Sequence, residues 1–394
     1  MQARSRFSTL VVSSILLSAL IAGCAAPAAT PAPTAIPTSP PPTPTVAPPA
    51  DEQAKPAPLS ANVTTFASGL VYPRGLKFGP DGALYVAEAG SGGDTESMGN
   101  CEGFTSMFVP YRTGMTARVS RIGPDGVRST VVDNLPSAQD QFGDVIGASD
   151  VVFVDQTLYA VSSSGGCSRG FADSPAGIVK VNSDGTSDML ADLSAFFTAH
   201  PAAAGNEEDY EPDGSANAVV AHDGKLYIVN ANHGSLDEIT LDGQVRRVLD
   251  ITASQGHVTP ASLTVHDGNF YVGALGKFPI RVGSVNVYQI TPQGDMSVVA
   301  KGLTAVLGLA FDEQGRLYVL EATHEDSDYP GPGAGRVVRV GEAGELEVIA
   351  TGLSFPIGMT FGPDGALYVS NYGYGGDPTA GEVLRIDVNS RAMR

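Results

Sequence analysis

Short apolar runs separated by tight polar turns recur along most of the chain. The eight residues 79–86 (GPDGALYV) return unchanged at 362–369. Weaker copies lie at 155–159, 222–227, 266–271 and 313–318. Asp-Gly between two alternating apolar runs is a strong hairpin signal, and several copies follow another short apolar run, such as 75–78. Each unit therefore predicts short antiparallel strands joined by tight turns.

The number and spacing of the copies predict the architecture. Six copies of a four-strand unit indicate an all-β fold, a six-bladed β-propeller, and the repeated phrase resembles those of NHL/TolB-like propellers. Segment 63–70 resembles the fourth strands at 298–303 and 346–353, although it precedes the first blade, and the sixth repeat stops after its third strand. We therefore expect the N-terminal strand to close the ring by joining the last blade. An irregular pair of β-sandwiches is the rival, and it does not explain six copies.

Composition supports this class and excludes others. The chain has 47 Gly and 28 Pro, with 42% hydrophobic and 16% charged residues, which suits a turn-rich β-protein with a sizeable core. Its 42 acidic against 23 basic residues give a formal charge of −19, which argues against nucleic acid as a partner. The absence of Trp argues against a tryptophan-lined sugar cleft.

The N-terminus has the pattern of an export signal rather than part of the fold. A basic start, an apolar stretch and Leu-Ile-Ala-Gly before Cys24 resemble a bacterial lipobox, so residues 1–23 are expected to be a lipoprotein signal peptide and Cys24 to be lipidated. Residues 24–58, rich in Pro, Ala and Thr, form the expected tether, and 59–394 the propeller. This predicts an exported protein anchored to the outer face of the cell envelope. A plain secreted protein is the alternative.

The repeats resemble those of NHL-type propellers, and the C-terminal half is more similar to the ScyD/ScyE family, associated with cyanobacterial scytonemin gene clusters. The segments that carry this resemblance are 259–263, 273–279, 302–321 and 361–371. It extends over essentially all of 62–388. Because that family has no agreed activity, the resemblance implies an architecture rather than a chemistry.

Two cysteines remain after Cys24. Cys101 and Cys167 each fall in the expected loop between the second and third strands of a blade, one in blade 1 and one in blade 2. Neighbouring loops on one face of an exported protein favour a Cys101–Cys167 disulfide. Free thiols or a redox pair are the alternatives, although a redox site usually has Cys-x-x-Cys.

One column of the repeat carries polar side chains three residues after each repeated Tyr. Its polar members include Glu88, Asn230, Glu321 and Asn371. We expect them to point into the central channel and to hold either Ca²⁺, which prefers such oxygen ligands, or channel water. The gluconolactonase class of propellers binds metal at the start of the innermost strands, where only Asn217 fits here, with Asp150 close by. The possible ring therefore comprises Glu88, Asn230, Glu321, Asn371, Asn217 and Asp150.

The irregular loops are expected on one face and the repeated Asp-Gly turns on the other. Because function concentrates in irregular loops on rigid scaffolds, this loop-rich face is the predicted contact surface. Its candidate contact residues are Arg74, Tyr210, His233, Phe278, His324, Tyr329, Tyr372 and Tyr374. The favoured function is a monomeric binding or scaffold module for an extracytoplasmic protein, glycan or small ligand. The alternative is an exported lactonase-like hydrolase or sugar oxidoreductase with a metal at the channel.

Overall fold

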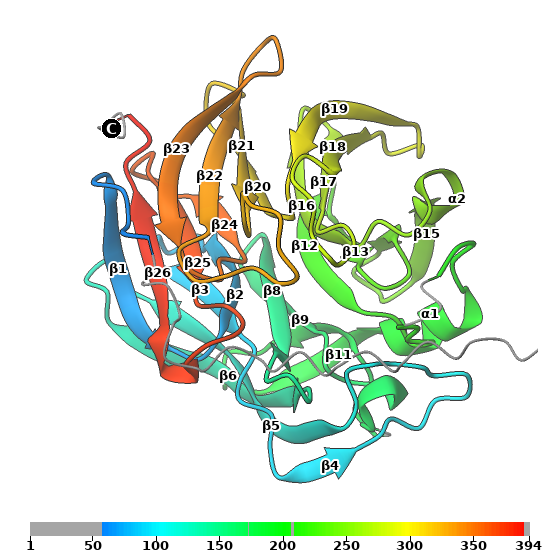
Figure 1. Cartoon of the computed structure of the whole chain (residues 1–394). Coiled ribbons are helices and arrows are strands. Elements are labelled where there is room, and N and C mark those ends of the chain that lie inside the picture. Colours follow the sequence, from blue (N-terminus) through cyan, green and yellow to red (C-terminus); the bar gives the residue numbers. More distant parts are fainter. Residues whose placement is uncertain (1–56, 172, 206–208, 390–394) are drawn as a thin grey trace, which may run out of the picture. The chain divides into compact units, whose positions relative to one another are not determined.

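The structure is a computed structural model that describes residues 57–171, 173–205 and 209–389. These residues form six antiparallel sheets, each one blade of a β-propeller (Figure 1). The predictions on the signal peptide, on Cys24 and on the tether up to residue 56 lie outside the described residues. The predicted fold class is confirmed.

The first three blades follow one another along the chain. Blade 1 contains β2 (Pro73–Phe78), β3 (Leu84–Glu88), β5 (Tyr111–Ile122) and β6 (Arg128–Gln139), with β4 (Thr95–Ser97) paired to β5 and β7 (Val145–Ile146) paired to β6. Blade 2 contains β8 (Ala148–Val154), β9 (Thr157–Ser162), β10 (Gly177–Val181) and β11 (Ser187–Asp192). Blade 3 contains β12 (Ala216–His222), β13 (Lys225–Asn230), β14 (Ser235–Ile239) and β15 (Val245–Asp250).

The last three blades repeat this order, and short helices lie in the connections. Blade 4 contains β16 (Pro260–His266), β17 (Asn269–Ala274), β18 (Val285–Ile290) and β19 (Met296–Leu303). Blade 5 contains β20 (Val306–Phe311), β21 (Leu317–Glu321), β22 (Gly335–Val340) and β23 (Leu346–Leu353). Blade 6 contains β24 (Met359–Phe361), β25 (Leu367–Asn371), β26 (Gly381–Ile386) and β1 (Val63–Leu70). The helices are α1 (Leu193–Ala199), α2 (Thr252–Gln255) and the 3₁₀ turns η2 (Cys167–Arg169) and η3 (Pro378–Ala380).

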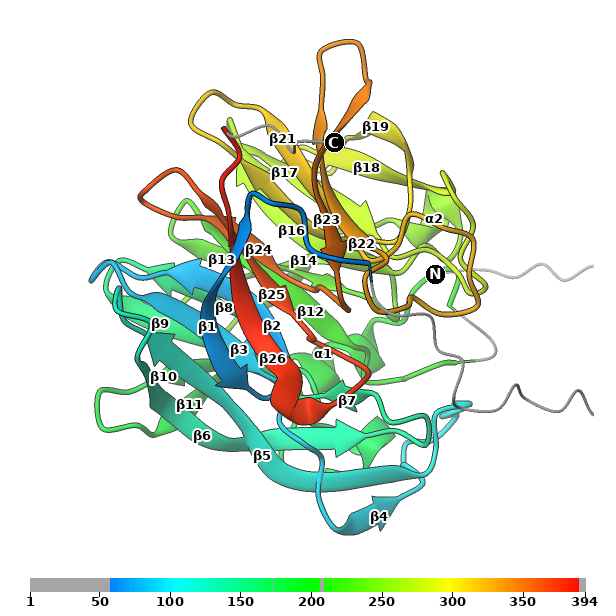
Figure 2. The ribbon, with the colours of Figure 1, turned by 60° about the vertical axis from the view of Figure 1, so that its left-hand side comes forward.

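The N-terminal strand closes the ring as predicted. β1 pairs antiparallel with β26, from Val63 opposite Ile386 to Leu70 opposite Gly381, and Figure 2 shows the two strands side by side. Strands from opposite ends of the propeller domain thus share one sheet. This pairing covers the edge that β26 would otherwise expose.

The core is divided among the interfaces between blades. Six large clusters of buried apolar side chains each join residues of two neighbouring blades, including blades 6 and 1. One example packs Leu320 of β21 with Val369 of β25. Because each sheet is buried on both faces, the second strands read as nearly continuous apolar runs.

The repeated phrase has a structural explanation. Asp81 accepts hydrogen bonds from the Tyr85 hydroxyl at 3.2 Å and from Arg121 Nε at 2.8 Å, so the turn is tied to the third strand of its blade. The second copy makes the same contacts with Asp364, Tyr368 and Arg385. The turn residue Gly82 has φ +73°, which favours glycine. The repeated phrase therefore specifies a tight hairpin turn and the Asp and Tyr side chains that hydrogen-bond it to its blade.

Candidate functional site

The central channel is narrow and lined by the innermost strands. Its cavity volume is about 40 Å³, and its walls come from β2, β8, β12, β16, β20 and β24 with the residues just before them. A buried water molecule needs a cavity of roughly 10–15 Å³. The channel cavity therefore has room for a few waters and not for a sugar or a lactone. Its polar lining residues are Lys77, Ser149, Asp150, Asn217 and Ser262.

Asp150 and Asn217, two of the predicted ring residues, do line this channel, and both tie blades together. The Asp150 carboxylate accepts the N–H of Val151 at 2.8 Å and of Val219 at 2.9 Å. Burial raises the pKa of Asp150 to about 6, which the charge of Lys77 opposes. The Asn217 amide donates to the Ala261 carbonyl at 3.2 Å. Both side chains therefore link the innermost strands of neighbouring blades.

The other four predicted ring residues do not line the channel, so that prediction is wrong. Glu88, Asn230, Glu321 and Asn371 stand at the ends of second strands, whereas first strands form the channel wall. Each side-chain oxygen instead accepts a backbone N–H from the connection that enters its own blade. These N–H donors belong to Val71 (2.7 Å), Ser215 (2.9 Å), Thr304 (2.6 Å) and Ser354 (2.8 Å). The column is a set of braces repeated in four blades.

The two glutamates of the column also form ion pairs with arginines. Glu88 pairs with Arg118 at 3.1 Å and with Arg128 at 3.4 Å, and Glu321 pairs with Arg336. Both carboxylates are completely buried. The channel itself contributes the single carboxylate Asp150 among its described lining residues, which falls short of the six to eight oxygens that Ca²⁺ takes. The donor set therefore does not fit the expected calcium ring.

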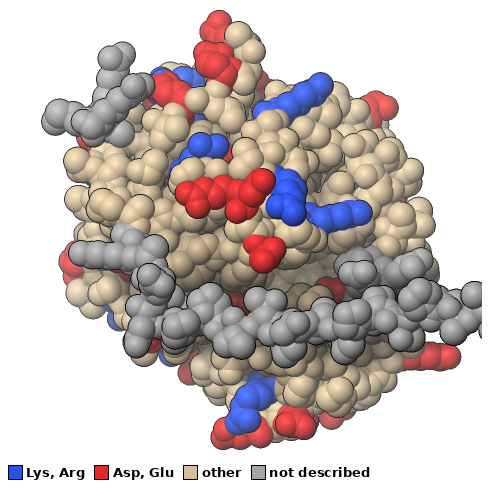
Figure 3. Space-filling view, viewed as in Figure 1, with Lys and Arg blue, Asp and Glu red and all other residues tan. Residues whose placement is uncertain are grey.

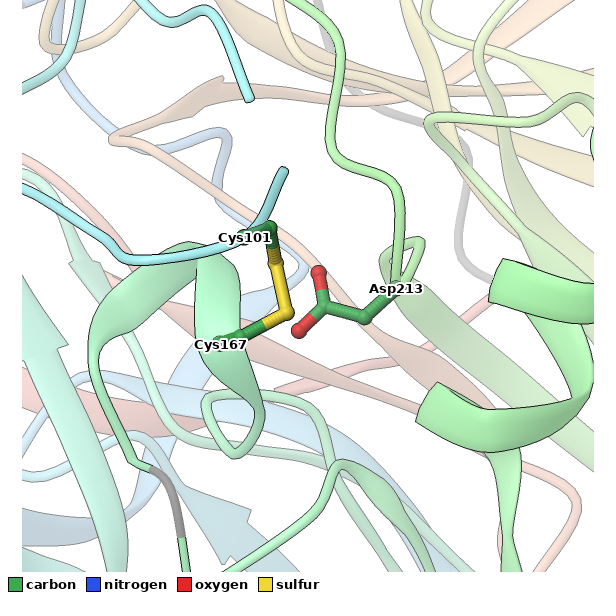
Figure 4. Close-up of side chains that lie close together, drawn as sticks. All are labelled: Cys101, Cys167 and Asp213. Atoms are coloured by element: carbon green, nitrogen blue, oxygen red, sulfur yellow. A yellow bond between two sulfur atoms is a disulfide. The ribbon is translucent and has the colours of Figure 1, made fainter. Parts of the chain in front are cut away.

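The predicted disulfide is present. Cys101 and Cys167 are bonded with their Cα atoms 5.0 Å apart, and they join the long loops of blades 1 and 2 (Figure 4). Asp213 points toward this bond and accepts a hydrogen bond from the Ser168 N–H at 3.1 Å. Within the described residues, these two cysteines and Asp213 are the one group of three His, Cys, Asp or Glu side chains close enough to share a metal ion. Because the sulfurs are bonded to each other, they provide no thiolate ligand.

Tyr210 and His233, two of the predicted contact residues, pack against each other. Their rings stack at 5.6 Å, and His233 is fully buried with its Nε2 2.8 Å from the Glu211 carbonyl. Next to them, Arg169 and Glu211 form a buried ion pair at 2.7 Å. These contacts are typical of packing, and they fix the long loops of blades 1, 2 and 3 against one another.

A different set of polar groups meets at the mouth of the channel on the loop-rich face. Arg74 precedes Gly75, a channel-lining residue, and its Nη2 donates to the Val145 carbonyl. The Tyr329 hydroxyl donates to Asp144. Among the described residues, the buried Arg74 Nε and the Tyr374 hydroxyl have no hydrogen-bond partner. Burial lowers the pKa of Arg74 and raises that of Tyr374.

Aromatic side chains surround these groups and extend to the surface. Phe278, 50% exposed, stacks on Tyr329, 42% exposed, with ring centres 6.0 Å apart. Tyr329 contacts Tyr374 edge to face at 5.9 Å, and Tyr374 contacts Phe355 at 5.3 Å. Of the predicted contact residues, the structure thus brings together Arg74, Phe278, Tyr329, Tyr374 and, through Phe355, Tyr372. We call Phe278, Tyr329, Tyr374 and Phe355 the aromatic rim.

His324 and the segment between β6 and β7 also belong to this face. His324 is held within its own loop, because its Nδ1 lies 2.6 Å from the Ala334 carbonyl. Asp144 and Phe142, which the sequence did not single out, lie in the short segment between β6 and β7. Phe142 is 63% exposed, and the three exposed aromatic side chains of the described residues, Phe142, Phe278 and Tyr329, all belong to loops of this face.

Comparison with known proteins identifies the fold and no more. No family model and no curated protein matches the chain. A protein of unknown function from Bacteroides thetaiotaomicron has a similar structure, with TM-score 0.53, 13% identity, and 84% of this chain and 76% of that chain covered. A putative oxidoreductase (glucose dehydrogenase) from Thermus thermophilus has TM-score 0.51 and 18% identity, with 82% and 99% covered. These likenesses agree with the six-bladed propeller.

Proposed function

We propose that this chain is a lipid-anchored, extracytoplasmic propeller of the ScyD/ScyE type that binds a protein partner through its loop-rich face. The lipobox-like sequence before Cys24 and the Pro-rich segment after it support the anchor and the tether. The Cys101–Cys167 disulfide supports an oxidising compartment outside the cytoplasm. Within the described part of the chain, no helix is long and apolar enough to cross a bilayer.

The observation that carries this proposal is the aromatic rim. Exposed large apolar side chains that cluster on one face of a protein commonly mark an interaction site. Tyr and Arg dominate the energetic centres of protein interfaces, which are ringed by polar groups. Here Phe278 and Tyr329 stack at the surface, Arg74 lies behind them, and the acidic loop 325–328 borders them. A protein surface with apolar and basic side chains is the partner that matches this arrangement.

The alternative, an exported lactonase-like hydrolase or sugar oxidoreductase with a metal at the channel, has less support. It depends on Glu88 and Glu321, whose oxygens are occupied by arginines and backbone N–H groups. It also needs space for a substrate, and the channel holds about 40 Å³. The exposed aromatic side chains of the loop-rich face therefore support a binding role more strongly than the channel residues support catalysis.

Recovery of a partner from the envelope of the producing cells tests this function. The double variant Phe278→Ala/Tyr329→Ala should lose a partner that the unaltered full-length chain retains, because it removes the stacked pair. Its matched control is Val298→Ala/Val299→Ala, which truncates two exposed apolar residues on the outer strand β19 of blade 4. Equal recovery by both double variants would contradict the proposal.

A further inference from the structure

A second cavity on the loop-rich face is larger than the channel. Its volume is about 260 Å³, close to the lower end for small-molecule sites. One wall is the connection that enters blade 4, with His257, and the other is the loop between β17 and β18, with Lys277 and Arg281. Tyr288 of β18 contributes to the lining from within the sheet, and its ring is buried. The cavity therefore belongs to a single blade.

The lining of this cavity has a positive charge on a strongly acidic protein. It includes the cations Lys277 and Arg281 and no Asp or Glu, whereas the whole chain carries 42 acidic residues against 23 Lys and Arg. Near the centre of the surface in Figure 3, a group of basic side chains lies beside a group of acidic ones. The acidic loop 325–328 borders this wall, because Ser327 pairs with Ile280. Its Asp326 lies 3.9 Å from Arg281, and since both side chains are exposed, this ion pair neutralises little of the arginine charge.

The cavity lining also contains neutral hydrogen-bonding side chains. His257 is one of the lining residues, but its Nδ1 atom is buried out of reach of the cavity and its Nε2 lies 3.1 Å from the Thr259 hydroxyl. Ser284 and Asn286 add a hydroxyl and an amide to the same lining.

We infer that this cavity binds a small organic or inorganic oxyanion, a molecule that carries a carboxylate or phosphate group. Lys277 and Arg281 supply the opposing charges, and the side chains of Ser284 and Asn286 supply hydrogen bonds. This inference does not depend on the proposed protein partner. The two are nevertheless close, because Phe278 of the aromatic rim lies between the cavity residues Lys277 and Pro279.

Calorimetric titration of the full-length chain tests the site, with inorganic phosphate and citrate as separate probes at low ionic strength. We expect one equivalent of at least one anion to bind, and the preferred probe tells phosphate from carboxylate. Lys277→Gln/Arg281→Gln should weaken binding by at least about tenfold, since it removes both charge-assisted contacts. The control Lys180→Gln/Lys301→Gln removes two exposed charges elsewhere and should leave affinity within about twofold.

A second measurement does not rely on variants. Mass spectrometry of the unaltered chain after lysine acetylation should show that the bound anion protects Lys277 and leaves Lys301 reactive. The inference is overturned if neither anion binds at millimolar concentration, if the two double variants weaken binding equally, or if Lys277 reacts equally with and without anion.

Discussion

Glu321 at the end of β21 and Tyr374 at the channel mouth are both buried polar side chains, but their surroundings differ. The Glu321 carboxylate accepts the Thr304 N–H and pairs with Arg336. The Tyr374 hydroxyl has no partner among the described residues, and neither has the nearby Arg74 Nε. Because buried polar groups are normally satisfied, complete partnering indicates a structural role, and an orphaned group indicates a place for a ligand or water.

The same contrast separates the two faces of the propeller. The turn face repeats one solution, in which Asp81 and Asp364 each tie a tight turn to a Tyr and an Arg of the same blade. The loop-rich face joins groups from distant parts of the chain, such as Tyr329 and Asp144. The contacts that recur from blade to blade thus stabilise the fold, while the loops that differ between blades form the candidate sites.

The largest expected effect on stability comes from removing the disulfide, which joins two long loops of the loop-rich face. Cys101→Ser/Cys167→Ser should lower the free energy of unfolding by about 4 kcal/mol, because the disulfide closes a loop across 66 positions. Denaturant unfolding measures this, and a reducing agent should destabilise the unaltered chain but not the variant. A loss below about 1 kcal/mol would mean that the long loops are held by other contacts, such as Arg169–Glu211.

The second largest loss of stability is expected from substituting Glu321, which braces the connection into blade 5. Glu321→Ala leaves the half-buried Arg336 without its partner and the Thr304 N–H without an acceptor, so we expect a loss of about 3 kcal/mol. The matched control is Glu347→Ala, which breaks a more exposed pair with Arg339 and should cost at most about 1 kcal/mol. Equal losses in thermal or denaturant unfolding would contradict a structural role for the column.

Asp150 provides a test by pH. Its folded pKa of about 6 lies above that of an exposed carboxyl, so the folded state binds the proton more tightly. The stability from this proton is complete below about pH 4 and is lost as the pH rises through about 6. We expect this group to lower stability on the order of 2 kcal/mol between pH 4 and pH 7. Asp150→Asn should remove that part of the slope, and an unchanged slope would contradict the assignment.

The smallest expected effect concerns the Tyr374 hydroxyl, and it tests most sharply whether buried polar groups differ in how completely they are hydrogen-bonded. Tyr374→Phe removes a hydroxyl that has no hydrogen-bond partner among the described residues, and it should change the free energy of unfolding by less than about 0.5 kcal/mol, or even increase it. Tyr227→Phe removes the hydroxyl of another buried tyrosine, one that donates to Glu238 at 2.9 Å, and should cost about 1.5–3 kcal/mol. A similar loss in both variants would show that the Tyr374 hydroxyl is satisfied in solution.

The sequence predicted the features that depend on repetition and failed where contacts cross between loops. The Asp-Gly turns, the six blades, the closing strand 63–70 and the Cys101–Cys167 bond all follow from local patterns and their alignment. The polar column was placed in the wrong environment, because the alignment shows that Glu88 and Glu321 are equivalent and not which strand lines the channel. No local pattern could reveal that Tyr329 meets Asp144, 185 positions away.

Site-specific photo-crosslinking tests the central claim, that the loop-rich face binds a partner, most directly. Benzoylphenylalanine in place of Phe278, in the full-length chain within its own envelope, should give a discrete crosslinked protein, which Tyr329→Ala should abolish. The same probe in place of Val127, which is 65% exposed in a tight turn of the opposite face, should give none. Crosslinks from Val127 alone, or identical products from both positions, would contradict the claim.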